Sequence, residues 1–190
     1  MAEFFGDVNR ATVRVLTRNG FDVVVPQNQG CCGALHAHAG DIAMARKLAT
    51  ANIEAFGSEE YGPLDAVVSN SAGCGAALRE AGQWLPGRGE ALASQARDVC
   101  EWLDEVGLRP PTRALPGRVC YDDPCHLVHA QGIADAPRRL LSAIPQLILT
   151  EHADPHSCCG AAGTYNLLQP EMSRQVLAPK LDALAVAKPD

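Results

Sequence analysis

The spacing of apolar residues in the first hundred positions predicts helices that alternate with short strands. Apolar side chains recur at helical intervals over 8–17, 35–56 and 91–106, and each of these stretches is predicted to be a helix. Short, continuous apolar runs at 21–26 and 64–69 predict buried strands. Strands that alternate with helices are typical of an α/β fold with a parallel sheet and right-handed crossovers.

The second half of the chain repeats this order of elements. Strands are predicted at 118–122 and 146–150, and helices at 136–144 and at about 170–184. Pro179 falls inside the last helix, where a proline removes a backbone hydrogen bond, so a kink is expected there. The predicted fold class is therefore α/β, with two tandem repeats of a small parallel-sheet domain related by pseudo-symmetry.

The segment Gly107-Leu-Arg-Pro-Pro111 separates the two series of elements. Consecutive prolines stop helices and stiffen the chain, so this segment is the predicted linker. The predicted domains are therefore 1–110 and 111–190.

Two copies of one short motif suggest a duplicated binding unit. The triplet Cys31-Cys32-Gly33 recurs as Cys158-Cys159-Gly160, and each copy follows an apolar run and precedes a helical pattern. Adjacent cysteines suit a packed core poorly, because one side chain points inward while its neighbour points away. In parallel α/β sheets, ligands bind beyond the carboxyl ends of the strands, where all the cysteines except Cys100 and Cys120 are predicted to lie.

The spacing of the other cysteines indicates that each unit is incomplete. Cys125 lies 33 residues before Cys158, whereas the matching position in the first half would precede Met1. Cys74 lies 42 residues after Cys32, whereas the matching position in the second half would follow the last residue. The chain is therefore expected to be the interior of a longer protein, with a leading cysteine missing from the first unit and a closing cysteine missing from the second.

Composition narrows the possible classes of function. The 190 residues are 47% hydrophobic and carry a formal charge of −6 with no long Lys/Arg block, which argues against a nucleic-acid or anionic-membrane surface. No apolar stretch approaches the ~18 residues of a membrane helix, and the first residues lack the features of a signal peptide. A cytoplasmic protein is expected, in which eight cysteines favour metal ligands or redox thiols over disulfides.

The clustered cysteines point to a soft metal centre. Thiolates suit iron–sulfur clusters, zinc or copper(I), and iron–sulfur clusters usually take four cysteines. A Cys-Cys pair at a helix N-terminus suits such a cluster, because the helix dipole lowers thiol pKa and free backbone N–H groups can donate to sulfur. Gly33 and Gly160 would let the backbone approach the cluster, and the turn Asn70-Ser-Ala-Gly-Cys-Gly75 would add a sulfur from the next strand end.

Several cysteines and histidines also have a structural explanation. Cys100, on the apolar face of a predicted helix, and Cys120, inside a predicted strand, are expected to belong to the core. His36 and His38 are ligand candidates beside Cys32, and a surface or substrate-contact role for them is equally open.

The turn after the strand at 118–122 carries further polar residues. His126 follows Cys125 directly, so it can either hydrogen-bond a sulfur or stabilise the turn. Asp122 and Asp123 are expected to cap the turn rather than to bind another group.

Four segments resemble the signatures of the cysteine-rich CCG-domain family. They are Gln29-Gly-Cys-Cys-Gly-Ala-Leu-His-Ala-His-Ala-Gly40, Asn70-Ser-Ala-Gly-Cys-Gly75, Asp123-Pro-Cys-His-Leu127 and Cys158-Cys-Gly-Ala-Ala-Gly-Thr-Tyr-Asn166. The similarity extends over residues 4–187. The family includes the iron–sulfur subunits of glycolate oxidase and anaerobic glycerol-3-phosphate dehydrogenase, lactate-utilisation proteins and the heterodisulfide reductase B subunit, and the resemblance is strongest to the glycolate oxidase branch.

The resemblance implies an electron-transfer subunit that works with flavoprotein subunits. In such complexes a flavin subunit oxidises a 2-hydroxy acid such as glycolate, and electrons pass through iron–sulfur centres, expected here to be of the 4Fe-4S type, toward a membrane acceptor. A cytoplasmic location, peripheral at the inner membrane through the complex, is implied as well. The family's N-terminal ferredoxin-like segment is missing, so the sequence resembles a fragment. By resemblance, the first centre would use Cys31, Cys32 and Cys74, and the second Cys125, Cys158 and Cys159.

Three other classes of function stay open at this point. Thiol–disulfide catalysis of the heterodisulfide reductase type is one, although Leu35-His-Ala-His38 favours the glycolate branch. A structural zinc module is another, in which three cysteines and either His36 or His126 complete a tetrahedral site. The third is an α/β scaffold with reduced cysteines.

Overall fold

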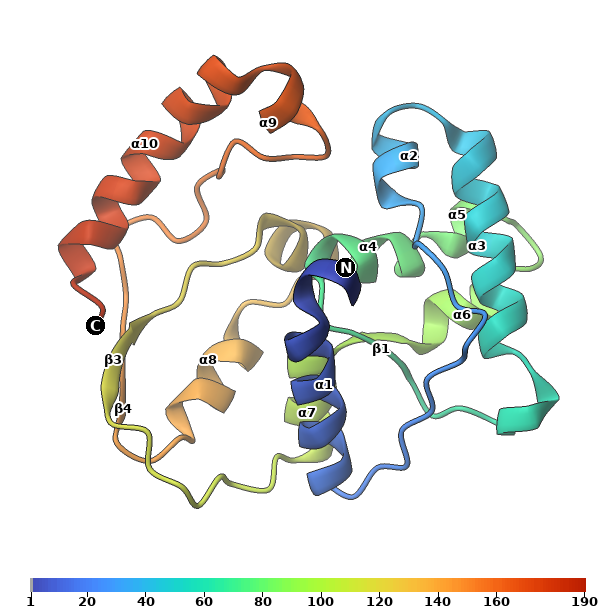
Figure 1. The fold of residues 1–190 in the computed structure, drawn as a ribbon, viewed down its shortest axis with the longest axis horizontal. Coiled ribbons are helices and arrows are strands. Elements are labelled where there is room, and N and C mark those ends of the chain that lie inside the picture. The colour runs from blue at the N-terminus through green and yellow to red at the C-terminus, as the bar shows by residue number, and fades with distance from the viewer. Residues whose placement is uncertain (1) are drawn as a thin grey trace.

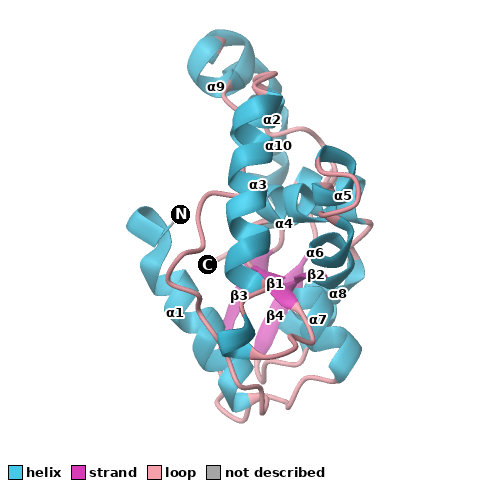
Figure 2. Cartoon of the chain, turned by 90° about the vertical axis from the view of Figure 1, so that its right-hand side faces the viewer, coloured by secondary structure: helices cyan, strands magenta, loops and turns pink. Residues whose placement is uncertain are grey.

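The computed structural model describes residues 2–190 and consists of short strands surrounded by helices (Figures 1 and 2). The elements of the first half are α1 (Ala2–Arg18), α2 (Ala34–His38), α3 (Ile42–Phe56), η1 (Glu59–Tyr61), β1 (Val67–Ser69), α4 (Ala72–Arg79), α5 (Ala81–Trp84), α6 (Glu90–Gln95), β2 (Ala96–Asp98) and α7 (Val99–Val106). Those of the second half are β3 (Gly117–Cys120), η2 (His126–Ala130), α8 (Asp135–Ser142), β4 (Leu147–Thr150), α9 (Tyr165–Leu168) and α10 (Pro170–Ala187). None of the helices described is both long and apolar enough to cross a membrane.

The strands form one parallel pair in each half of the chain. In the first half β1 pairs with β2, from Val67 opposite Ala96 to Ser69 opposite Asp98. In the second half β3 pairs with β4, from Gly117 opposite Leu147 to Cys120 opposite Thr150. The predicted α/β class with parallel strands in two repeats is therefore confirmed.

The predicted strand at 21–26 is wrong. This segment pairs with no strand in the described part of the chain. Val24 is 41% exposed and Val25 is 59% exposed, so the segment is not buried either. An apolar run becomes a strand only where a neighbour satisfies its backbone groups, and the described residues place no partner beside it. Its counterpart β4, by contrast, pairs with β3.

The two longest predicted helices are each interrupted. The helix predicted at 35–56 divides at Gly40, whose φ of +83° no other residue adopts readily, and α3 restarts with the Asp41 carboxylate accepting from the Met44 N–H at 3.1 Å. The helix predicted at 91–106 gives way to β2, because pairing with β1 overrides the helical pattern of residues 96–98.

Asp98 restarts the chain as a helix immediately after β2. Its carboxylate accepts from the Cys100 N–H at 2.8 Å, and the Glu101 carboxylate accepts from the Asp98 N–H at 3.2 Å. This capping box satisfies the free N–H groups of the first turn of α7. Burial raises the pKa of Asp98, and the backbone N–H groups that it binds oppose that shift.

The elements of the second half are closer to expectation. β3, α8 and β4 lie within two residues of the predicted ranges, and α10 continues through Pro179 to Ala187. Sequence periodicity did not indicate the short π-helix η2 or the single helical turn α9. Each of these elements has five or fewer residues, and such a segment is too short for a helical period of apolar residues to be recognised.

The two halves share a hydrophobic core. Val67, Ala81 and Leu92 form a cluster within the first half. A second cluster, made of Leu127, Ile133 and Ala136, packs against Ala72 and Cys100 of the first half. In Figure 1, α4 lies between the two halves and α7 lies close to α8.

The glycine of each Cys-Cys-Gly triplet packs against a long helix further along the same repeat, α3 in the first repeat and α10 in the second. Gly33 has φ +85° and Gly160 has φ +72°, in the left-handed region that favours glycine. A Cβ on Gly33 would lie 3.1 Å from the Cα of Ala45, and one on Gly160 would lie 2.5 Å from the carbonyl oxygen of Ser173. The close approach predicted for these glycines is therefore to a helix of the same repeat.

Gly33→Ala should lower the free energy of unfolding by about 1–3 kcal/mol, because a left-handed conformation and a tight backbone contact both oppose a Cβ. Gly160→Ala should cost more, since its contact with Ser173 is closer. Chemical denaturation of each variant would measure the loss. Gly30→Ala is the matched control, because a Cβ at Gly30 meets nothing within 4 Å; an equal loss in that variant would contradict this explanation.

Asp98→Ala should destabilise the protein by about 0.5–2 kcal/mol through loss of the helix cap, and Asp98→Asn, which keeps an acceptor oxygen, by less. The pKa of Asp98 is raised in the folded protein, so the folded state binds its proton more tightly and ionisation costs stability as pH rises. The stability of Asp98→Asn relative to the unmodified protein should therefore improve as pH rises from about 4. Urea unfolding at several pH values would test this, and a difference that is independent of pH would contradict it.

Candidate cysteine centres and the cavities between the repeats

The two Cys-Cys pairs have the same arrangement in both repeats. Cys31 and Cys158, the first of each pair, are exposed, whereas Cys32 and Cys159 are half-buried. All eight cysteines are free thiols. The sequence-based expectation that one member points inward and the other away is met in both copies.

Cys74 lies beside Cys32. The predicted turn at 70–75 is in fact the start of α4, with Cys74 in its first helical turn. The neighbouring Cys32 thiol, together with the Ser71 side chain, lowers the pKa of Cys74 to about 6, and the same interaction and burial raise the pKa of Cys32. This interaction favours the thiolate at Cys74, and the thiolate is the form of cysteine that binds metals.

Cys125 and Cys159 face a common cavity. Cys125 precedes η2, and the Nδ1 atom of His126 lies 3.4 Å from its Sγ atom, which agrees with one of the two roles that the sequence left open for His126. The cavity has a volume of about 280 Å³, and its other wall is the start of α4 at 71–73. Cys158 lies outside it, and its Sγ atom accepts from the Gly160 N–H at 3.3 Å.

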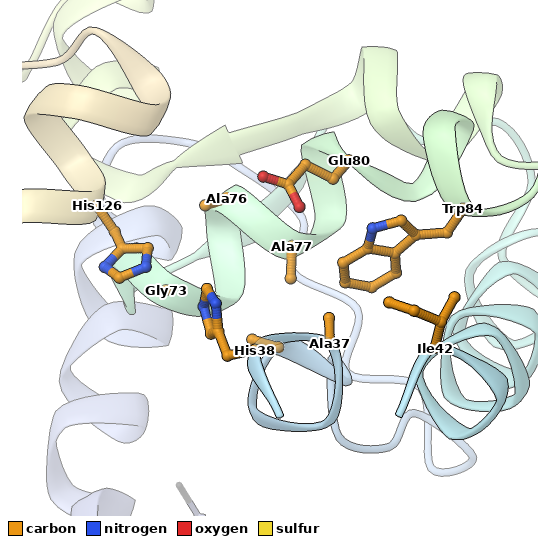
Figure 3. A pocket seen from close by; sticks show the side chains of 10 residues that line it. Ala37, His38, Ile42, Gly73, Ala76, Ala77, Glu80, Trp84 and His126 are labelled. Carbon is orange, nitrogen blue, oxygen red and sulfur yellow. The ribbon is translucent and has the colours of Figure 1, made fainter. Parts of the chain in front are cut away.

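A second cavity of about 320 Å³ lies on the other side of His126 (Figure 3). His38 and His126 meet edge to face at its rim, with ring centroids 5.3 Å apart. Glu80 and Trp84 supply its other polar and aromatic groups, and small or apolar residues complete its wall: Ala34, Ala37, Ile42, Gly73, Ala76 and Ala77. His36 lines neither cavity, and its Nδ1 atom lies 3.5 Å from a carboxylate oxygen of Asp41.

The remaining two cysteines lie apart from these groups. Cys100 packs against the core cluster shared by the two halves, and burial raises its pKa to about 12. Cys120 is the last residue of β3 and is half-buried. Their expected role in the core agrees with these positions.

The sequence predicts that Asp122 and Asp123 cap a turn, and this prediction is wrong. Each forms an ion pair in which one partner is buried and the other half-buried: Asp122 with the buried Lys180 of α10, and the buried Asp123 with Arg138 of α8. His152 and His156 complete these contacts. The partners are 15 to 58 residues away in sequence, so no local spacing signal identifies them.

The donor groups fit a soft metal or an iron–sulfur cluster in chemical type. Within residues 2–190, no three His, Cys, Asp or Glu side chains converge closely enough to hold a metal ion. Cys32 and Cys74 interact directly, and Cys125 and Cys159 line one cavity. Thiolates of this kind suit iron–sulfur or zinc chemistry rather than hard cations such as Mg²⁺ or Ca²⁺.

Known proteins resemble the chain along almost its whole length. It is 37% identical to a probable glycolate oxidase iron–sulfur subunit of Bacillus subtilis and 36% identical to the glycolate oxidase iron–sulfur subunit of Escherichia coli, over 97% of this chain in each case. It covers only 43% and 46% of those two proteins. Lactate utilization protein A of Oceanobacillus iheyensis is 30% identical over 97% of this chain, which covers 76% of that protein.

The family model for the cysteine-rich domain CCG matches residues 1–79 and again 119–190. Both matched stretches contain one Cys-Cys-Gly triplet, and the inward and outward cysteines, the left-handed glycine and the following helix recur in each. The chain therefore belongs to the CCG family of cysteine-rich domain proteins.

Proposed function

We propose that this chain is an iron–sulfur electron-transfer subunit, or a segment of one, in a flavin-dependent dehydrogenase of 2-hydroxy acids such as glycolate. The observation that carries the proposal is the set of free thiols that recurs in both repeats, within a chain whose relatives include glycolate oxidase iron–sulfur subunits. The chain spans less than half the length of those relatives, so the complete activity would require further segments or subunits.

Each repeat would contribute one set of cysteines, Cys31, Cys32 and Cys74 in the first and Cys125, Cys158 and Cys159 in the second. A 4Fe-4S cluster bound by such thiolates accepts and releases single electrons at a potential that hydrogen bonds to sulfur adjust. The residues of this chain would hold the sulfurs and set their surroundings. His126, in contact with the Cys125 sulfur, would donate to it, and the backbone at 71–73 would enclose the neighbouring cavity.

The proposed partners are flavoprotein subunits that oxidise the 2-hydroxy acid and pass electrons to this chain. The electrons would continue toward a membrane acceptor, with the complex in the cytoplasm or peripheral at the inner membrane. The proposed domain boundary between residues 110 and 111 falls within Pro110-Pro111, which lies between α7 and β3.

After anaerobic reconstitution, the protein should contain iron and an equal amount of acid-labile sulfide, with a visible absorption band that dithionite bleaches. Cys32→Ser and Cys159→Ser should each remove about half of the iron if each repeat holds one centre. Cys100→Ser is the control, because Cys100 packs in the core, and its iron content should be unchanged. Iron, sulfide and zinc analysis of the four proteins would measure this.

Zinc without sulfide would replace this proposal with a structural zinc module. A folded protein that binds neither iron nor zinc would rule out both. Iron lost equally from the Cys32→Ser, Cys159→Ser and Cys100→Ser variants would show that stability rather than ligation controls binding.

A further inference from the structure

A buried polar residue occupies the same place in both repeats, on the helix that supports the Cys-Cys-Gly loop. Asn52 lies seven residues after Ala45, the residue of α3 against which Gly33 packs. Lys180 lies seven residues after Ser173, the residue of α10 against which Gly160 packs. Seven residues make about two helical turns, so both polar side chains face the loop. Asn52 is 2% exposed and Lys180 is 3% exposed.

In the first repeat the contact between helix and loop is direct and uncharged. The Asn52 carboxamide oxygen accepts from the Gly30 N–H at 2.8 Å, and its amide nitrogen donates to the Cys31 carbonyl at 3.0 Å. One side chain thereby holds the backbone on both sides of the peptide that enters the Cys-Cys pair.

In the second repeat the corresponding contact is ionic. The Lys180 ammonium donates to the Asp122 carboxylate at 2.6 Å and to the Pro155 carbonyl at 3.4 Å. The His152 Nε2 atom lies 3.2 Å from the same carboxylate oxygen. Lys180 thus connects α10 both to the end of β3 and to the segment that leads into Cys158.

Asp123 makes the most completely buried contact of this group. Its side chain is 0% exposed, and both carboxylate oxygens accept from the Arg138 guanidinium, at 2.7 and 2.9 Å. The Nε2 atom of His156 lies 3.1 Å from the same carboxylate. Asp123 precedes Cys125 by two residues and His156 precedes Cys158 by two, so one carboxylate joins the two chain segments that carry these sulfurs.

We propose that Asp123 is a positioning residue that fixes Cys125 relative to Cys158 and Cys159, and that Asn52 does the same for Cys31 and Cys32. This inference rests on the proposed function for its purpose, but its geometric claim concerns the thiols themselves. The carboxylate needs both oxygens and its charge for this role, because it holds the Arg138 guanidinium and a histidine at once. A neutral amide in its place loses one acceptor and the charge at the fully buried end of the pair, and it leaves Arg138 only the exposed Glu151 carboxylate at 3.7 Å, so the contact weakens.

The test is site-resolved alkylation of the reduced, metal-free protein, with the rate at each cysteine measured by mass spectrometry. Asp123→Asn should raise the rates of the half-buried Cys125 and Cys159 by about tenfold through local opening, and leave Cys32 unchanged. Asn52→Ala should raise the rate of Cys32 and leave Cys125 and Cys159 unchanged. Asp104→Asn is the matched control, since Asp104 also binds an arginine through both oxygens, Arg139 on α8, but lies away from both loops.

The reconstituted proteins give a second readout. Asp123→Asn and Asn52→Ala should each lose about half of the iron, and the Asp104→Asn control none. Equal acceleration of all half-buried cysteines in Asp123→Asn, or no acceleration of Cys125 and Cys159, would overturn the inference, as would the same pattern in the Asp104→Asn control. If the unmodified protein binds no iron, the proposed function fails, and the alkylation pattern still decides whether Asp123 and Asn52 position the thiols.

Discussion

Each Cys-Cys-Gly loop packs against a long helix of its own repeat, the first against α3 and the second against α10. The positions of the two neighbouring sulfurs depend on that contact. The glycine makes the contact possible, because it alone combines a left-handed conformation with the absence of a Cβ. Once Gly33 lies against Ala45, Cys32 is held toward the protein interior and Cys31 toward its surface. The same constraint acts at Gly160. The backbone contact of the glycine therefore explains why both repeats have one exposed and one half-buried cysteine, and no bond to sulfur is needed for this arrangement.

The two repeats stabilise this loop in chemically different ways. Asn52 satisfies two backbone groups of its loop with a single neutral side chain. Around the second loop, two carboxylates, two cations and two histidines are brought together, and several of them are fully removed from solvent. Such a group tolerates burial only while its charges remain matched and hydrogen-bonded. The second loop therefore depends on the fold of α8, β3 and α10 together, whereas the first depends mainly on α3.

The sequence revealed what is encoded locally and missed what depends on distant partners. The repeated triplet, the strands β3 and β4 and the helix α8 follow from short apolar patterns that the packing reinforces. The run at 21–26 is apolar like β4, yet it pairs with no strand among residues 2–190 and forms no regular structure. Residues 96–98 interrupt a helical pattern that continues on both sides of them, because β2 pairs with β1 there. The Asp122 and Asp123 ion pairs were not predictable, since a carboxylate beside a proline looks like a turn cap until its remote cation is known.

The second repeat also determines how the first presents its third cysteine. Gln131 is the residue directly after η2, and its side-chain amide donates to the Ala72 carbonyl at 2.9 Å. Ala72 belongs to the helical turn of α4 that carries Cys74. The Gln131 side chain fits there because residue 75 is glycine: a Cβ at Gly75 would lie 2.9 Å from the Gln131 carboxamide oxygen. The small residues around Cys74 thus leave room for side chains of the second repeat. His126, at the start of η2, lines both cavities. Cys74 and Cys125 therefore lie on segments that pack directly against each other, α4 and the start of η2.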